Sequence, residues 1–269
     1  MDILYWKALA MGLLEGLTEF LPVSSTGHLI LLDQWLHVGS EKFTGMFEIV
    51  IQMGAILAVV IYFWHRLWPW RRGMHAEQQR EVWSVWGKTL VGVLPALVIG
   101  FMLDHWLKAR LMRPAVVAGA LGAGGVVLWL IERRRLTPQI MTLAQLTFKM
   151  ALGIGLIQCL AMVPGTSRSA ATIIGAMLLG CSRMVAAEYS FFLAIPTLGA
   201  ASLYALVKTG FKFAPAEWMA LGIGMAVSFV TALAVVAFLM RYLQTRNFIP
   251  FAVYRIILAV VVCWFLVVR

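Results

Sequence analysis

The sequence predicts an all-α polytopic membrane protein made of two inverted repeats, each a re-entrant helical hairpin followed by three transmembrane helices. The first observation is composition: the chain of 269 residues is 62% hydrophobic, has a mean hydropathy of +0.88, and has only 13% charged residues. Soluble domains are only about half apolar. The second is that several apolar stretches are long enough to span a bilayer. The third is that proline and polar residues interrupt two further apolar stretches in the middle, which predicts broken helices.

Six apolar segments are predicted to cross the membrane, because a span needs roughly 20 apolar residues. Four shorter segments form two pairs, each broken at a turn that contains proline. Their lengths are short for complete spans, so each pair is interpreted as a hairpin that enters and leaves on one side. Two additional full spans per pair is the alternative. The predicted spans are 43–64, 86–103, 114–131, 188–207, 218–240 and 248–268, and the paired segments are 3–21 with 24–36 and 148–163 with 167–181.

The two halves of the chain resemble each other. The order of elements is the same in both, and the register that aligns their polar breaks places Ser24 over Ser167. The predicted repeats cover about residues 1–136 and 142–269 of one integral membrane domain, 1–269. Since each repeat holds three full spans, the second must be inverted relative to the first. The similar segments are 12–17 with 155–160 and 114–117 with 250–253.

The net charge of +10 does not indicate a nucleic-acid partner. Basic residues lie in short loops between apolar segments, which is the pattern of membrane topology. A nucleic-acid interface would gather them on one face. Lys and Arg are more frequent in the loops at 66–88, 133–149 and 241–246 than in those of the other side, so these loops are predicted to be cytoplasmic. The bilayer is the expected partner, and the sequence leaves a homodimer open.

The first break, EGLTEFLPVSSTGH at residues 15–28, carries two carboxylates at membrane depth. Glu15 and Glu19 are spaced i, i+4, so they share one face of a helix. Ionisable groups inside a membrane are costly and mark functional sites by default. Two carboxylates on one face suit a hard divalent cation, Mg or Ca, or a proton relay. The alternative is a pair that caps a polar helix contact.

Ser25 and His28 follow at the start of the next helix, spaced i, i+3 on one face. A serine hydroxyl is a poor nucleophile until a base takes its proton, and a histidine one turn away can reach it or a bound water. The alternative for His28 is a buried, hydrogen-bonded histidine. Ser24 and Thr26 are placed either to cap the helix or to contact substrate.

The second break, PGTSRSAAT at residues 164–172, is predicted to cradle a phosphate. Gly165 lets the backbone approach a ligand closely. A helix that starts here offers free N–H groups to an anion. Arg168 adds a guanidinium fork that matches phosphate oxygens. The alternative is a capped helix with an arginine that reaches toward the membrane edge. The other polar positions of the cradle are Thr166, Ser167, Ser169 and Thr172.

A phosphate cradle beside a serine–histidine pair and two carboxylates predicts hydrolysis of a lipid-borne phosphate. Either Ser25 or a water activated by His28 would attack the terminal phosphorus. A transporter or flippase for a phosphorylated lipid is the rival, because inverted repeats with broken helices are also a transporter architecture. The serine–histidine pair and the carboxylates favour the enzyme, since binding alone does not need them.

Both motifs resemble those of the bacterial undecaprenyl pyrophosphate phosphatase, or bacitracin-resistance, family. The similarity runs along the whole chain and includes residues 47–54 and 248–255. It implies hydrolysis of undecaprenyl pyrophosphate to undecaprenyl phosphate and inorganic phosphate, which recycles the lipid carrier for peptidoglycan synthesis and confers bacitracin resistance. It also implies a divalent-cation requirement and an active site that faces the periplasm from the bacterial inner membrane. The residues carried over are Glu15, Glu19, Ser25, His28, Ser167, Arg168, Ser169 and Thr172.

Overall fold

The computed structural model describes residues 3–33, 38–111, 113–134 and 136–265, and their regular structure is helical apart from one isolated bridge between Ile140 and Cys181. Within these ranges, five helical segments are long and apolar enough to cross a membrane: Glu41–Tyr62, Ala76–Gly100, Pro114–Arg133, Arg183–Thr209 and Pro215–Tyr242. The helices are α1 (Ile3–Thr18), α2 (Ser25–Asp33), α3 (Glu41–Val50), α4 (Gln52–Tyr62), α5 (Trp64–Leu67), α6 (Ala76–Leu111), α7 (Pro114–Arg133), η1 (Leu143–Gln145), α8 (Phe148–Gln158), η2 (Cys159–Met162), α9 (Arg168–Leu178), α10 (Arg183–Thr209), α11 (Pro215–Tyr242) and α12 (Ile249–Cys263).

The helices follow the predicted order, with corrections to their bounds. Five of the six predicted spans are long enough to cross a membrane, whereas the sixth, predicted at 248–268, is the shorter helix Ile249–Cys263 within the described residues. The span expected at 43–64 consists of α3 and α4, joined at Ile51, whose torsions remain helical (φ −62°, ψ −21°). The helix predicted at 86–103 is longer in the structure, because α6 runs from Ala76 to Leu111. Its first turns are rich in Glu, Gln and Arg, which favour helix but carry no hydropathy signal. Positions 34–36 and 266–268 of two other predicted segments lie outside the described residues.

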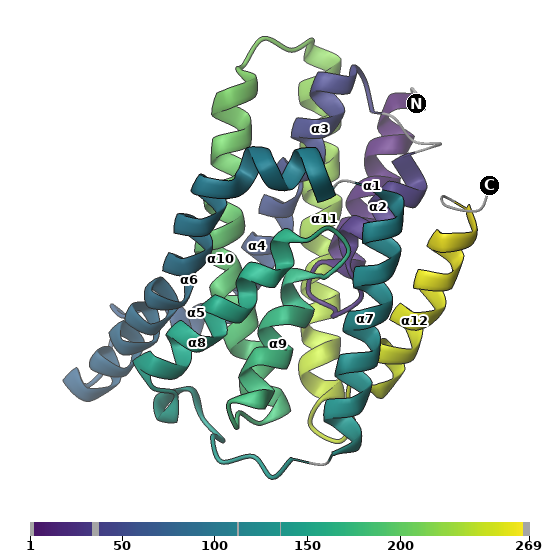
Figure 1. The fold of residues 1–269 in the computed structure, drawn as a ribbon. Coiled ribbons are helices and arrows are strands. Elements are labelled where there is room, and N and C mark those ends of the chain that lie inside the picture. Colours follow the sequence, from purple (N-terminus) through teal and green to yellow (C-terminus); the bar gives the residue numbers. More distant parts are fainter. Residues whose placement is uncertain (1–2, 34–37, 112, 135, 266–269) are drawn as a thin grey trace.

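Two helical hairpins reach the middle of the molecule from opposite ends (Figure 1). α1 and α2 form the first, and α8, η2 and α9 form the second. Both return at a serine in a conformation that favours glycine: φ is +72° at Ser24 and +70° at Ser167. Such torsions are uncommon in residues with a side chain and are found where surrounding structure holds them, often at functional sites.

Each hairpin is packed into the other half of the chain. α1 lies along α11, α8 lies along α6, and α7 pairs with α12. Glycines permit the first two contacts: a Cβ on Gly12 would lie 3.0 Å from the Cα of Gly224, and one on Gly155 would lie 3.0 Å from the Cα of Gly92. Small residues let helices approach closely inside a membrane. The two breaks are therefore held by helices from opposite halves.

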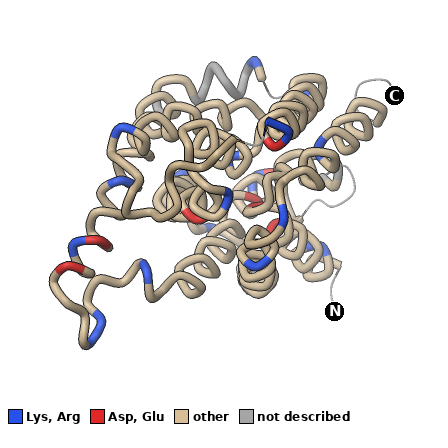
Figure 2. Tube along the Cα trace, turned by 90° about the horizontal axis from the view of Figure 1, so that it is seen from below, with Lys and Arg blue, Asp and Glu red and all other residues tan. Residues whose placement is uncertain are grey.

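Most of the charged residues that the structure describes lie within helices, many of them close to helix ends, and Figure 2 shows a few among the packed helices. One ion pair fixes α10 to α7 at the end away from the start of α1: Arg183 Nε lies 2.8 Å from Glu132 Oε1. The side chain of Glu132 is fully buried. Glu188 on α10 pairs with Arg66 in the same region. These pairs leave the polar groups at the breaks as a separate cluster.

Candidate active site

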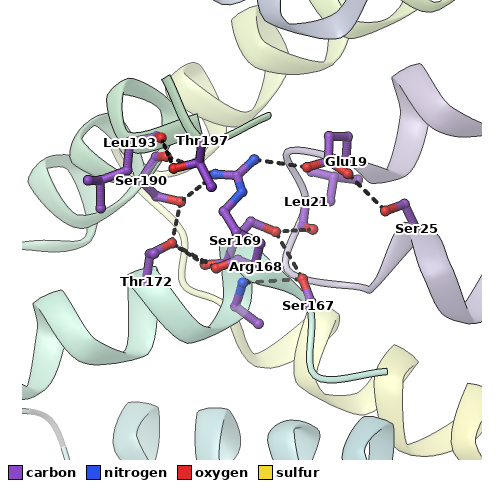
Figure 3. A network of polar contacts seen from close by, with 11 residues as sticks. Glu19, Leu21, Ser25, Ser167, Arg168, Ser169, Thr172, Ser190, Leu193 and Thr197 are labelled. Carbon is purple, nitrogen blue, oxygen red and sulfur yellow. Dashed lines mark hydrogen bonds and ion pairs between the residues drawn. The ribbon is translucent and has the colours of Figure 1, made fainter. Parts of the chain in front are cut away.

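An ion pair joins the two helix breaks at the centre of the molecule. Arg168, the first residue of α9, donates from Nη2 to Glu19 Oε1 at 3.0 Å, and their side chains are only 10% and 6% exposed. The same guanidinium lies over the ring of Phe20, 5.8 Å from its centroid. Burying such a pair is costly, so it is weak support for stability and a stronger indication of function. Figure 3 shows the two side chains meeting from different hairpins.

Ser25 shares the carboxylate of Glu19. Its hydroxyl donates to Glu19 Oε2 at 2.8 Å, while Oε1 of the same group accepts from Arg168 (Figure 3). The sequence predicted His28 as the partner of Ser25, because the two are spaced i, i+3. The structure instead places Ser25 against a carboxylate from the other side of the break. A carboxylate within hydrogen-bond distance of a hydroxyl is positioned to accept its proton.

His28 is oriented away from Ser25 by two other contacts. Its Nδ1 lies 2.7 Å from the carbonyl oxygen of Ser24. A carbonyl only accepts, so Nδ1 carries a hydrogen and donates it. Nε2 then faces the hydroxyl of Tyr254 on α12 at 2.6 Å, and the two rings stack with centroids 5.6 Å apart. Tyr254 was not predicted as a site residue, although it lies in an apolar segment that had been singled out for its similarity.

Residues of α9 and α10 orient Arg168 and connect it to the first break. Its Nη1 donates to the carbonyl oxygen of Ser190 on α10 at 2.8 Å. Thr172 lies 2.6 Å from the Ser190 hydroxyl, and Ser169 donates to the carbonyl oxygen of Leu21 in the first break at 2.9 Å (Figure 3). Ser190 was missed because a lone serine in an apolar helix gives no signal. Ser169 and Thr172 are fully buried and use their hydroxyls on protein atoms. Their role toward substrate stays a prediction.

The remaining predicted positions divide between packing, capping and exposure. Gly165 has φ +92°, and a Cβ there would lie 2.9 Å from the Cα of Val117 on α7, so its close approach is to protein backbone.

The hydroxyl oxygens of Ser24 and Ser167 accept from the backbone N–H three residues on, at 3.3 and 3.2 Å, which caps α2 and α9. Thr26 is exposed. The backbone carbonyl of Thr166 accepts from an arginine of α12.

Glu15 is the acidic group of the site with spare ligand capacity. It is fully buried, and within the described part of the chain neither of its carboxylate oxygens has a hydrogen-bond partner. Gln158, which the sequence register places opposite it, is 2% exposed and likewise has an unpartnered side-chain amide among those residues. In the same ranges no three His, Cys, Asp or Glu residues gather as a metal site. Any cation would therefore need further oxygen ligands from substrate and water.

The fold and this cluster define a multi-pass helical membrane protein with a buried acid–arginine–serine centre. Residues 8–261 match the family described as bacitracin resistance protein BacA. The chain belongs to this family, which confirms the resemblance found in the motifs. Undecaprenyl-diphosphatase 1 of Clostridioides difficile is 45% identical over 96% of this chain and 94% of its own length. The undecaprenyl-diphosphatases of Limosilactobacillus fermentum and Enterococcus faecalis are 46% and 44% identical, each over 95% of both chains.

Proposed function

We propose that this protein is an undecaprenyl-diphosphatase, which hydrolyses undecaprenyl pyrophosphate to undecaprenyl phosphate and inorganic phosphate. Relatives that carry this name align with nearly the whole chain. Such an activity recycles the lipid carrier of peptidoglycan synthesis and gives resistance to bacitracin. The observation that supports it most directly is the carboxylate of Glu19, which binds Arg168 and Ser25 with its two oxygens.

The proposed reaction begins with attack by Ser25. Its Oγ bonds to the terminal phosphorus as the bridging P–O bond breaks, and the electron pair leaves with the lipid monophosphate. Glu19 receives the hydroxyl proton over the 2.8 Å contact. Arg168 stabilises charge on the phosphoryl oxygens, which is the main catalytic requirement of phosphoryl transfer.

The second half of the reaction removes the phosphate from Ser25. A water attacks the phosphoserine, the Oγ–P bond breaks, and Glu19 returns the proton to the serine oxygen. We assign to His28 the role of the base that accepts a proton from that water. To do so, its Nε2 must leave the hydroxyl of Tyr254. Direct attack on the substrate by a water that His28 activates is the alternative route. This route also requires His28 to leave the hydroxyl of Tyr254, but it forms no covalent intermediate.

A divalent cation, Mg or Ca, fits the acidic side of this site. Glu15 has two buried carboxylate oxygens without partners among the described residues, and Glu19 lies one turn away. Mg²⁺ is commonly held by one or two carboxylates together with substrate phosphates. When bound, the ion would neutralise phosphate charge. The chain itself would supply the free oxygens of Glu15, together with the lone pairs of Glu19 that Arg168 and Ser25 do not use.

Phosphate release by the purified protein in detergent tests the function. Without closed compartments no vectorial transport occurs, so release of inorganic phosphate from undecaprenyl pyrophosphate requires hydrolysis. We expect release by the wild type and its near loss in Arg168→Ala. Binding of the lipid without release would instead favour the transporter or flippase that shares this architecture.

The symmetry of the two breaks supports the finer architecture. We infer two inverted repeats, about 1–136 and 142–269, within a single integral membrane domain. They account for the shared torsions of Ser24 and Ser167 and for hairpins that approach from opposite ends.

The site is reached from the periplasmic side in this proposal. A homodimer stays a prediction that the mass of the purified protein can test.

Labelling in intact cells tests the orientation. Arg72 and Phe211 are exposed and lie in loops that the charge distribution places on opposite sides of the membrane. In a background without Cys159, Cys181 and Cys263, Phe211→Cys should react with an impermeant thiol reagent and Arg72→Cys should not. The reverse pattern would place the site on the cytoplasmic side.

A further inference from the structure

Arg255 is a buried cation that no step of the proposed reaction uses. It lies on α12, is 0% exposed, and donates from all three guanidinium nitrogens to backbone carbonyl oxygens. Among the interactions of the described residues, none of its partners is a carboxylate. Burying a charge without an opposite charge is expensive, and at membrane depth such residues are normally functional. The positions of its acceptors indicate the function.

The acceptors of Arg255 belong to both helix breaks. Nη1 donates to the carbonyl oxygen of Pro22 at 3.3 Å, in the first break. Nη2 donates to the carbonyl oxygens of Gly165 and Thr166 at 3.2 and 2.9 Å, in the second break. One side chain therefore connects two loops that come from opposite ends of the molecule. Further contacts at 3.3 Å fix the guanidinium to α7 through the carbonyl oxygens of Ala120 and Leu121.

A glycine on α7 makes room for the guanidinium. A Cβ on Gly124 would lie 3.1 Å from Cζ of Arg255, and closer still to Nη2. Arg255 is held by contacts on several sides, so it could not move away from such a methyl group without losing some of them. Gly119 on the same helix would place its Cβ in open space. The two glycines form a matched pair: the same substitution displaces the guanidinium at one position and leaves it in place at the other.

We propose that Arg255 is a positioning residue that fixes the spacing of the two helix breaks, so that Ser25 and Arg168 reach the same phosphate. It acts through the backbone on either side of the site and not on substrate. This assignment rests on the proposed function. Reacting groups must be held closely, because a displacement of about 1 Å can cost about 100-fold in rate. The carbonyl oxygens of Pro22 and Thr166 are within two or three residues of the groups that are positioned.

Kinetics in detergent provide the first test. Arg255→Ala should lower kcat for phosphate release by about 100-fold while KM changes only a few-fold, because misalignment affects the reacting geometry more than binding. Arg255→Lys should recover little, since an ammonium lacks the planar fork that reaches both loops. Gly124→Ala should lower kcat by about tenfold, a partial version of the same misalignment. Gly119→Ala should leave kcat unchanged.

Arg183→Ala controls for general loss of stability. It removes a basic partner of the buried Glu132 at a distance from both breaks. We expect it to lower the thermal midpoint as Arg255→Ala does, while kcat per folded molecule stays near the wild-type value. An equal loss of kcat in Arg183→Ala, or normal kcat in both Arg255→Ala and Gly124→Ala, would overturn the assignment.

Spin labels measure the spacing without any substrate. Leu17 on α1 and Leu160 on η2 are 41% and 58% exposed and lie near the two breaks. In a cysteine-free background, labels at these positions should give a narrow distance distribution by double electron–electron resonance. Arg255→Ala and Gly124→Ala should broaden or shift it, and Gly119→Ala should not.

The two measurements separate the failure of this inference from the failure of the proposed function. If Arg255→Ala loses activity while the distribution stays narrow, Arg255 acts on the substrate and the positioning role is wrong. If the wild type releases no phosphate, the proposed function is wrong. The change in spacing on substitution of Arg255 or Gly124 would still decide whether this side chain ties the breaks together.

Discussion

The two helix breaks share the backbone conformation of one serine and differ in chemistry. Ser24 and Ser167 both have φ near +70°, with +72° and +70°, and each hydroxyl caps the helix that follows. The next residue is Ser25 in the first break and Arg168 in the second. One break thus presents a hydroxyl and the other a guanidinium, each directly after the serine with positive φ. The conformation is shared, and the side chain that follows it sets the role.

The charge around the breaks differs in the same way. The first contributes Glu15 and Glu19, whereas the position opposite Glu15 in the second is the neutral Gln158. Arg168 belongs to the second break and pairs with Glu19 across the gap. Opposite charges attract strongly where water is excluded. The asymmetry therefore holds the breaks together and places the proposed nucleophile, Ser25, near the proposed phosphate-binding cation, Arg168, through the carboxylate of Glu19.

Removing the serine that distinguishes the first break should have the largest effect. Ser25→Ala should lower phosphate release by more than about 10³-fold, because losing a nucleophile eliminates the covalent route. Ser24→Ala should retain most activity, since its hydroxyl caps α2. Release of phosphate from undecaprenyl pyrophosphate by the three purified proteins, including wild type, measures this.

His28→Ala separates the two routes to hydrolysis. With a serine nucleophile, this variant should accumulate a phosphoserine that mass spectrometry detects at position 25. Substantial turnover in Ser25→Ala together with complete loss in His28→Ala would instead support attack by water.

Removing the arginine that distinguishes the second break should have the next largest effect. Arg168→Ala should lower the rate by about 10²–10³-fold, the usual cost of losing one donor that stabilises transition-state charge. Arg168→Lys should recover little, because lysine cannot bind Glu19 and Ser190 with one planar fork. The rate per folded molecule is the measurement. Near wild-type turnover in a folded alanine variant would remove Arg168 from the site.

The hydropathy pattern and the residues of two short motifs predicted most of the individual helices and turns of this fold. The spans, both hairpins and the family follow from runs of apolar residues and from two short motifs. The start of α6 did not, because a polar helical extension carries no hydropathy signal. The side-chain contacts of Ser25 could not be predicted either. Spacing i, i+3 places His28 on the same helix face, whereas Glu19 reaches Ser25 only through the geometry of the turn.

Contacts between distant segments were beyond the sequence altogether. Glu19 and Arg168 were each identified as site residues, but their ion pair spans 149 positions and depends on how the hairpins meet. The link from Arg255 to Pro22 spans 233 positions. In the sequence, Arg255 is a charged residue within an apolar segment and has no indicated partner. Its five acceptors are backbone oxygens, which any residue type supplies and which therefore leave no trace in the sequence.

Exchanging charge between the paired positions Glu15 and Gln158 should have an intermediate effect. Glu15→Gln should lose most activity, and what remains should respond less to a chelator, because an amide is a poorer ligand for a hard cation. Gln158→Glu buries a new carboxylate without a paired cation, so it should lower the thermal midpoint more than the rate per folded molecule. If Glu15→Gln keeps its activity and its full sensitivity to chelator, Glu15 is not a ligand.

The smallest effects should come from the serines that the breaks share, and these test whether the backbones are equivalent. Ser24→Ala and Ser167→Ala each lose a capping oxygen, at about 1 kcal/mol, while keeping the positive φ. Glycine loses the same oxygen at a cost of only a few tenths of a kcal/mol and adopts this φ freely. Thermal midpoints in detergent should therefore rank glycine above alanine by a similar margin at both positions. A clear preference for glycine at one break only would mean that the two turns differ in solution, and that their shared geometry does not reflect a repeated scaffold.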